Sequence, residues 1–231
     1  MDNTIVGIIT EVSRQLNDQD TSIPNGLFVR WPAIDLLEYL NDALIRVAVL
    51  KPDVTIGPTN MPVVPGIIQT LPADAKELIS IDYALINGCS DPVPLTRVDL
   101  GFAKSFYRNS CLTQPRYRPY NWAYEADNPS IYYLYPSVPG GSALTLLGTC
   151  RKDIPQFYSP SDTSTLPYHN KFHNALVSWM QARAYEVDHE SESSLKLAAQ
   201  HRADFERIMQ GIINTDQALH AGKLLPPGRR R

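Results

Sequence analysis

The sequence predicts an α+β fold: an antiparallel helix bundle, formed by the N- and C-terminal helices, with an inserted β-rich module and an extended C-terminal tail. Apolar residues recur with helical spacing near both ends of the chain, whereas 15 of the 19 prolines lie between Pro52 and Pro167. Prolines at that density exclude long helices from the middle of the chain. We therefore expect N-terminal bundle helices, an inserted β-rich module with a long loop, C-terminal bundle helices and a basic tail, at residues 1–51, 52–167, 168–213 and 214–231.

The first segment contains two amphipathic helices separated by the polar stretch NDQDTSIPNG. Apolar residues of the earlier helix recur every three or four positions: Ile5, Ile8, Ile9, Val12 and Leu16. The later helix lies between Arg30 and Asp53, where Pro32 suits the first turn and Pro52 ends the helix. Its apolar face, which we expect to pack against other helices, comprises Leu36, Leu37, Leu40, Ala43, Leu44, Val47 and Leu50. Its polar residues fall mostly on the other face: Asp35, Glu38, Asn41, Asp42 and Arg46.

The middle segment offers short strands between turn signals. β-Branched and aromatic residues favour strands at 77–86, 130–135 and 143–150. The last two flank SVPGG, so we expect them to form a hairpin. A long aromatic and basic loop is expected from about Phe102 to Asn128.

The third segment contains two further helices. Helical spacing relates Phe172, Leu176, Trp179, Met180, Arg183 and Val187. After DHESES, the same spacing relates Leu195, Ala198, Arg202, Phe205, Met209 and Ile212. The last stretch, NTDQALHAGKLLPPGRRR, has no such period, and we expect it to be extended and poorly ordered in the free chain.

Composition is that of a globular protein. Hydrophobic residues make up 43% of the 231 residues and charged residues 19%. No apolar run reaches the roughly 18 residues of a membrane span, and the acidic N-terminus does not resemble a signal peptide, so we expect the chain to stay in the cytosol where it is made. Cys89, Cys111 and Cys150 are widely spaced, which predicts small buried or half-buried side chains and no disulfide framework or zinc site.

Motifs of catalysis are absent from the sequence. It contains no GxSxG, GxxxxGK[ST] or GxGxxG pattern. His169 and His173 lie four apart in HNKFH, but Asn170 stands where a metalloprotease has its general-base glutamate, and no third ligand is near. We expect two histidines on a polar surface, no catalytic residues, no metal and no cofactor.

Aromatic and basic residues alternate in YRNSCLTQPRYRPYNWAY, from Tyr107 to Tyr124. This pattern could stack nucleic-acid bases, it suits a protein–protein contact, and it also fits a loop folded onto its own module. A sequence pI of about 5.9 and a net charge of −3 favour a protein partner. The candidate contact residues are Arg116, Arg118, Tyr120 and Trp122.

The C-terminal stretch is basic on an acidic chain. Residues 214–231 contain four basic residues and one acid, a net charge of +3, so residues 1–213 carry −6. We expect Leu224 and Leu225 to fill a partner's pocket while Arg229, Arg230 and Arg231 meet carboxylates or DNA phosphate. A solvated tail without a partner is the alternative.

Four stretches together resemble the head-to-tail adaptor (connector) proteins of tailed bacteriophages, including tail tubular protein A of short-tailed phages. In chain order they are WPAIDLLEYLNDALIRVAVLKPD, IIQTLPADAKELISIDYALING, NPSIYYLYPSVPGG and HNALVSWMQARAYEVDHESESSLKLAAQHRADFERIMQG. They run from about Trp31 to Gly211, which is most of the chain.

The resemblance implies a structural virion protein that is not an enzyme. Such a protein forms a ring with copies of itself, usually a dodecamer, in the neck between capsid and tail. The ring binds the portal protein and a tail or nozzle protein and surrounds the genomic DNA that passes through the channel at ejection, with no membrane partner. On this view the C-terminal tail becomes ordered on the portal. The alternatives are another neck or tail ring protein (a stopper or tail tube), a virion-associated cell-wall hydrolase, or a DNA-binding module that uses the arginine–aromatic stretch.

Overall fold

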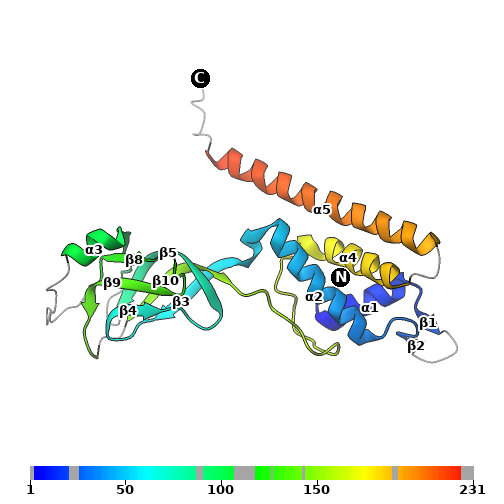
Figure 1. Ribbon diagram of the computed structural model, residues 1–231, viewed down its shortest axis with the longest axis horizontal. Coiled ribbons are helices and arrows are strands. Elements are labelled where there is room, and N and C mark those ends of the chain that lie inside the picture. Colours follow the sequence, from blue (N-terminus) through cyan, green and yellow to red (C-terminus); the bar gives the residue numbers. More distant parts are fainter. Residues whose placement is uncertain are drawn as a thin grey trace, which may run out of the picture. The chain divides into compact units, whose positions relative to one another are not determined.

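The computed structural model describes residues 3–20, 26–86, 91–106, 118–125, 127–141, 144–188 and 192–224. Helices and two four-stranded sheets confirm that the chain is of mixed α and β class. The chain divides into a helical unit, Met1–Val54 with Ile154–Arg231, and a strand unit, Thr55–Asp153 (Figure 1). Within the described residues, no helix is both long and apolar enough to cross a membrane.

The helical unit is built from α1 (Ile5–Gln15), α2 (Ala33–Leu50), α4 (His173–Val187) and α5 (Glu192–Leu224). α4 packs against α1, α2 and α5. The apolar stripes predicted for α1 and α2 are buried, apart from the partly buried Leu50 at the end of α2. Their burial explains the helices, because most helical stability in proteins comes from packing an amphipathic face.

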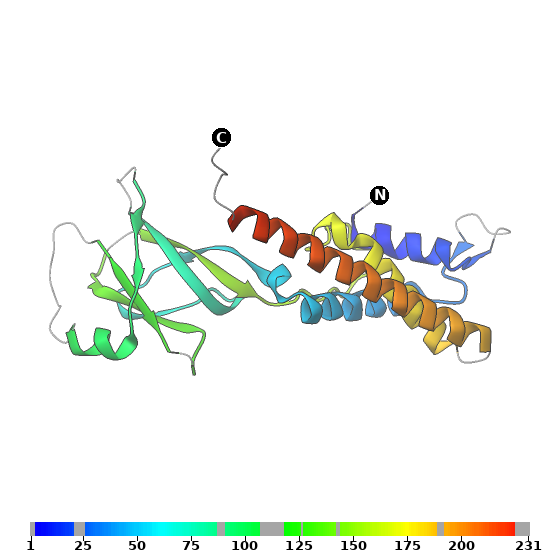
Figure 2. The same ribbon diagram turned by 90° about the horizontal axis from the view of Figure 1, so that it is seen from above.

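α5 runs back over α4, as Figure 2 shows. Ala198, Phe205 and Met209 of α5 are buried as the spacing predicted. Leu195 and Val187 are 50% and 57% exposed, although helical spacing relates them to buried residues of the same helices. Both lie within four residues of a helix end, next to the connection between α4 and α5.

Short elements connect these helices. β1 (Gln19–Asp20) pairs with β2 (Gly26–Leu27) in antiparallel fashion, at the ends of the stretch expected to be a polar loop. The 3₁₀ turn η1 (Pro52–Thr55) follows α2, and η2 (Asn170–Phe172) precedes α4.

Residues 154–167 belong to the helical unit, whereas the sequence placed them in the inserted module. The backbone N–H of Ile5 donates to the Ser164 carbonyl at 3.1 Å. The Asn41 side chain bonds both the N–H and the carbonyl of Phe157, at 3.0 and 2.9 Å. Prolines keep this segment from being helical, but its hydrogen bonds attach it to the helices, and the strand unit therefore ends at Asp153.

The strand unit contains two sheets, with strand orders β3-β10-β5-β6 and β4-β9-β8-β7. The strands are β3 (Ile56–Pro62), β4 (Gly66–Thr70), β5 (Ala75–Ile86), β6 (Val93–Pro94), β7 (Thr96–Arg97), β8 (Asn121–Tyr124), β9 (Ile131–Val138) and β10 (Leu144–Lys152). Residues of both sheets share one core: Met61, Ala75, Leu78, Ile81, Ala84, Leu95, Trp122, Tyr132, Leu134, Val138, Leu144, Leu146 and Cys150. Cys150 is buried as expected, and Cys89 and Cys111 lie outside the described residues.

The hairpin expected around SVPGG does not form, because β9 and β10 lie in different sheets. β9 pairs with β4 and β8, and β10 pairs with β3 and β5. Each strand therefore has a neighbour on both sides and no free edge for the other. Both instead bury one face in the shared core, with Tyr132 and Leu134 from β9 and Leu144 and Leu146 from β10.

The stretch expected to be a long loop, Phe102 to Asn128, contains regular structure. Helix α3 (Leu100–Phe106) occupies its start, and β8 forms four residues near its end. β8 is a strand because it pairs with β9 on one side and β7 on the other. Residues 107–117 and 126 lie outside the described residues.

The C-terminal helix is longer than expected. α5 continues to Leu224, so the extended conformation expected from Asn214 onwards is wrong for residues 214–224. The stretch lacks an apolar period, but Asp216 forms ion pairs that hold it to the rest of the unit, and the alanines and leucines favour a helix. Residues 225–231 lie outside the described residues.

Candidate functional site

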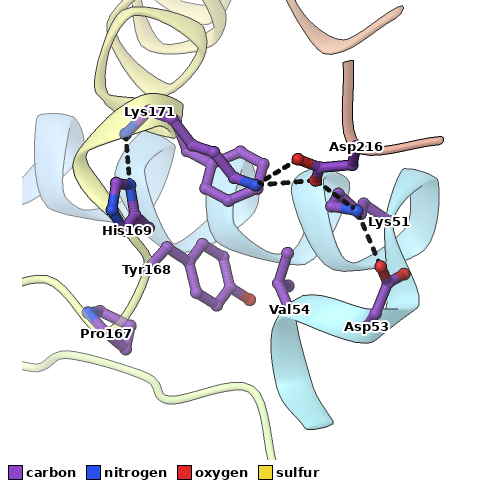
Figure 3. A pocket seen from close by; sticks show the side chains of 9 residues that line it. Lys51, Asp53, Val54, Pro167, Tyr168, His169, Lys171 and Asp216 are labelled. Atoms are coloured by element: carbon purple, nitrogen blue, oxygen red, sulfur yellow. Dashed lines mark hydrogen bonds and ion pairs between the residues drawn. The ribbon is translucent and has the colours of Figure 1, made fainter. Parts of the chain in front are cut away.

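Three charged residues from separate parts of the helical unit meet at one point. The Asp216 carboxylate on α5 accepts hydrogen bonds from the Lys171 ammonium at 2.7 and 3.0 Å and lies 2.9 Å from the Lys51 ammonium. Lys51 also donates to Asp53 at 2.7 Å. Figure 3 shows the two lysines reaching the carboxylate from either side. We call Lys51, Lys171 and Asp216 the clasp.

Local structure places each member of the clasp. Lys51 is the C-terminal cap residue of α2, where Pro52 ends the helix and starts η1. Lys171 lies in η2, whose first turn is capped by His169: the Nδ1 atom accepts from the Lys171 N–H at 3.1 Å. Asp216 lies about two turns before the end of α5. The clasp therefore attaches the C-terminal part of α5 to the end of α2 and the start of α4.

The charges of the clasp stabilise one another. Hydrogen bonds from Lys171 and then Lys51 lower the pKa of Asp216 to about 2. Burial by itself lowers the pKa of Lys51, but its hydrogen bonds to Asp53 and Asp216 outweigh that effect and the pKa is raised. The bond from Lys51 also lowers the pKa of Asp53. Asp216, Lys51 and Asp53 therefore remain charged at neutral pH.

The clasp forms one wall of an open pocket of about 340 Å³, which Val54, Pro167, Tyr168 and Phe172 also line (Figure 3). The polar groups of this pocket already bond to one another, and Tyr168 donates its hydroxyl hydrogen to the Leu44 carbonyl at 3.1 Å. Ammonium–carboxylate pairs of this kind hold elements together. In the part of the chain that the structure describes, no three His, Cys, Asp or Glu side chains gather as a metal site would need.

His173 is not a surface residue, which corrects the expectation from the sequence. Its side chain is 3% exposed, and Nε2 lies 2.9 Å from the Glu11 carboxylate. α4 begins at His173 and packs on α1, so the ring faces α1 and not solvent. Its role is a polar contact inside the helical unit.

The candidate contact residues of the strand unit separate into two classes. Arg118 and Tyr120 are exposed, Tyr120 by 49%. Trp122 is 2% exposed and lies in the core, stacked at 6.1 Å on Tyr124, so the assignment of its side chain to a partner contact is wrong. Trp122 is buried because it points from β8 towards the facing sheet. Arg116 lies outside the described residues.

Sequence reasoning missed the arginine that covers this core. The Arg97 guanidinium on β7 lies 4.6 Å from the Tyr124 ring centre and 5.7 Å from that of Trp122. Such cation–π contacts contribute about 0.5–2 kcal/mol each. The parallel pairing of β7 with β8 creates the contact, and no sequence spacing indicates it.

The candidate residues at the C-terminus are described only in part. Leu224 is the last residue of α5. Leu225, Arg229, Arg230 and Arg231 lie outside the described residues. Their assignment as partner contacts stays a prediction.

A second feature missed from the sequence lies on the outer face of α2. Ile34, Ile45 and Val49 are 48%, 40% and 61% exposed, beside the exposed Glu38 and the half-buried Asp35. Positions 34, 38, 45 and 49 follow one another at intervals of 4, 7 and 4 residues, and this helical spacing places them on a common face. We call these five residues the acidic-apolar face of α2.

Comparison with families of known proteins identifies a match over nearly the whole chain. A family model described as SU10 adaptor protein matches residues 3–231 of the chain. No curated protein matches it.

Proposed function

The chain belongs to the SU10 adaptor protein family, and we propose that it forms the adaptor ring that joins the portal to the tail of a bacteriophage and extends the DNA channel. The family match carries this proposal, because it covers nearly the whole chain and so includes both units. The resemblance to phage head-to-tail adaptors is confirmed at the level of the family. Such a protein acts by joining surfaces, with no bond made or broken.

The two units suit different contacts in this proposal. The helical unit, as an antiparallel bundle, is the body of each subunit, and neighbouring bodies meet through unlike surfaces, as a closed ring requires. A dodecamer is the ring size we propose. The exposed apolar side chains of α2 are one such surface, since Val49 is 61% exposed although it lies on a long packed helix.

The strand unit supplies contacts to the portal or to the tail and nozzle proteins. Arg118 and Tyr120 are exposed side chains of the types that contribute most to protein interfaces. The C-terminal residues Leu224, Leu225 and Arg229–Arg231 are the second proposed contact. Genomic DNA passes through the ring, and its phosphates are an alternative target for the arginines.

Imaging of the virus particle by cryo-electron microscopy tests the location. A closed ring of this chain between portal and tail is the expected result. A ring further along the tail would identify a stopper or tail-tube protein instead. Absence of the chain from purified particles would refute the structural role altogether.

A binding experiment tests the proposed contact of the strand unit. In a pull-down with purified portal and, separately, tail protein, the double variant Arg118→Ala, Tyr120→Ala should bind one of them at least tenfold more weakly, since each 1.4 kcal/mol lost is tenfold. Tyr158→Ala is the matched control, because Tyr158 is 83% exposed on the helical unit. Equal binding by both variants to both partners would refute the contact.

A further inference from the structure

The last turns of α5 continue its inward stripe beyond the helices that it packs on. Met209, Ile212, Asp216 and Leu219 share one face at spacings of three and four. Met209 is 1% exposed, Ile212 is partly buried, and Leu219 is 61% exposed. In Figures 1 and 2 the end of α5 reaches past the start of α4 and the end of α2. We call residues 217–224 the overhang.

The overhang is helical. Among its residues whose side chains the structure describes, Leu219 is the one large apolar residue, and it is exposed to solvent. Eight residues form a marginal helix on their own, so the overhang depends on the clasp at Asp216 and on the turns before it. A partner that covered Leu219 would stabilise it further, because the remaining exposed apolar surface of the side chain would be removed from water.

The acidic-apolar face of α2 is complementary to the overhang in its apolar side chains and in its charge. It offers Ile34, Ile45 and Val49 for apolar contact. Among the described residues, no lysine or arginine forms an ion pair with its two carboxylates, whereas the neighbouring Asp42 is paired with Arg183 at 3.2 Å. The overhang contains Lys223 and no acidic residue between 217 and 224. Apolar side chains and opposite charges therefore match on the two surfaces.

The overhang cannot lie on the same face of its own chain. The clasp fixes Asp216 beside Lys51, one residue past the end of α2, and α5 continues from there beyond the end of that helix (Figures 1 and 2). Its docking surface must then be provided by another molecule.

We propose that the overhang of one copy docks on the acidic-apolar face of α2 in a second copy. The two surfaces differ, so each copy can use its overhang on one neighbour and its α2 face on the other, which is the arrangement that closes into a ring. This inference rests on the proposed ring and names the contact that builds it. Leu219 packs against Ile45 and Val49 of the neighbour, and Lys223 meets Glu38 and Asp35.

Disulfide trapping in virus particles assembled with the variant chain tests the contact. A chain carrying both Val49→Cys and Leu219→Cys should give a ladder of covalent oligomers after mild oxidation, because every copy links to two neighbours. Each single variant should show only the background set by the wild-type chain with its native cysteines. Val187→Cys combined with Leu219→Cys is the matched control, since Val187 is 57% exposed and lies on α4 instead of α2.

The outcomes separate this inference from the proposed function. A ring seen in the same particles without a ladder would refute the inference and leave the adaptor role in place. A disulfide within one chain would refute docking on a second copy, and a crosslink from position 219 to the portal would identify the portal as the partner instead. If no ring is present in the neck, the proposed function fails.

Discussion

Phe205→Ala is the most informative change in the helical unit, because Phe205 attaches α5 to α4. Its side chain is fully buried, and its ring centre lies 4.9 Å from that of Trp179. The variant should therefore loosen the helix that carries Asp216 and Leu219.

The expected loss of stability follows from this burial. Removing the buried ring loses about 2–3 kcal/mol of transfer free energy, and the aromatic pair with Trp179 adds about 1 kcal/mol. The unfilled space brings the total to about 4 kcal/mol, within the usual range for Phe→Ala in a core. With a urea dependence of about 2 kcal/mol per molar, the unfolding midpoint should fall by about 2 M.

Urea unfolding followed by tryptophan fluorescence measures this loss, because Trp179 contacts the deleted ring. Leu195→Ala is the matched control on the same helix: Leu195 is 50% exposed, so its free energy of unfolding should change by no more than about 0.5 kcal/mol. Equal midpoints for the two variants would show that α5 does not depend on this contact.

Three further changes test the clasp, the packing of the strand unit and the burial of its aromatic residues. Since the pKa of Asp216 is lowered from 3.8 to about 2, its contribution to stability is complete above pH 3.8 and is lost as the pH falls towards 2; acid titration of the wild type should show this loss, and Asp216→Asn should lack it. Gly148→Ala should prevent folding of the strand unit, because the added Cβ overlaps a carbonyl oxygen of β5, whereas Gly57→Ala meets nothing within 4 Å; near-ultraviolet circular dichroism distinguishes them, and a folded Gly148→Ala protein would contradict the close approach. Trp122→Ala should lower the free energy of unfolding by about 3–5 kcal/mol, whereas Tyr120→Ala should change it by about 0.5 kcal/mol or less; equal urea midpoints would contradict the different burial of the two rings.

Local pattern predicted the elements whose burial follows one helical face. In α1 and α2 the spacing of apolar residues identified the buried side chains and the approximate ends, since one stripe decides which side packs. Local pattern did not predict which strands pair, because that depends on contacts between segments distant in the sequence. β9 and β10 are consecutive strands that a turn could join, but each is paired on both sides by strands distant in the sequence.

The candidate site was predicted less completely than the fold. The sequence pattern proposed Arg118 and Tyr120, which are exposed, as contact residues. It also proposed Trp122, which is buried, because aromatic residues occur both in cores and in interfaces and the pattern does not distinguish the two. The clasp was not found, because Lys51, Lys171 and Asp216 are far apart in the chain and share no motif.

By itself, the sequence determined the α+β class, the helical segments at both ends and the membership of an adaptor family, because these depend on local periodicity and on motifs in order. The tertiary structure alone decided that α5 continues to Leu224, that residues 154–167 pack with the helices, and that α2 presents an exposed apolar and acidic face. These features depend on which distant segments meet. Ion pairs of Asp216 with Lys51 and Lys171 hold the last turns of α5 to the rest of the unit, and no apolar period in the sequence indicates these contacts.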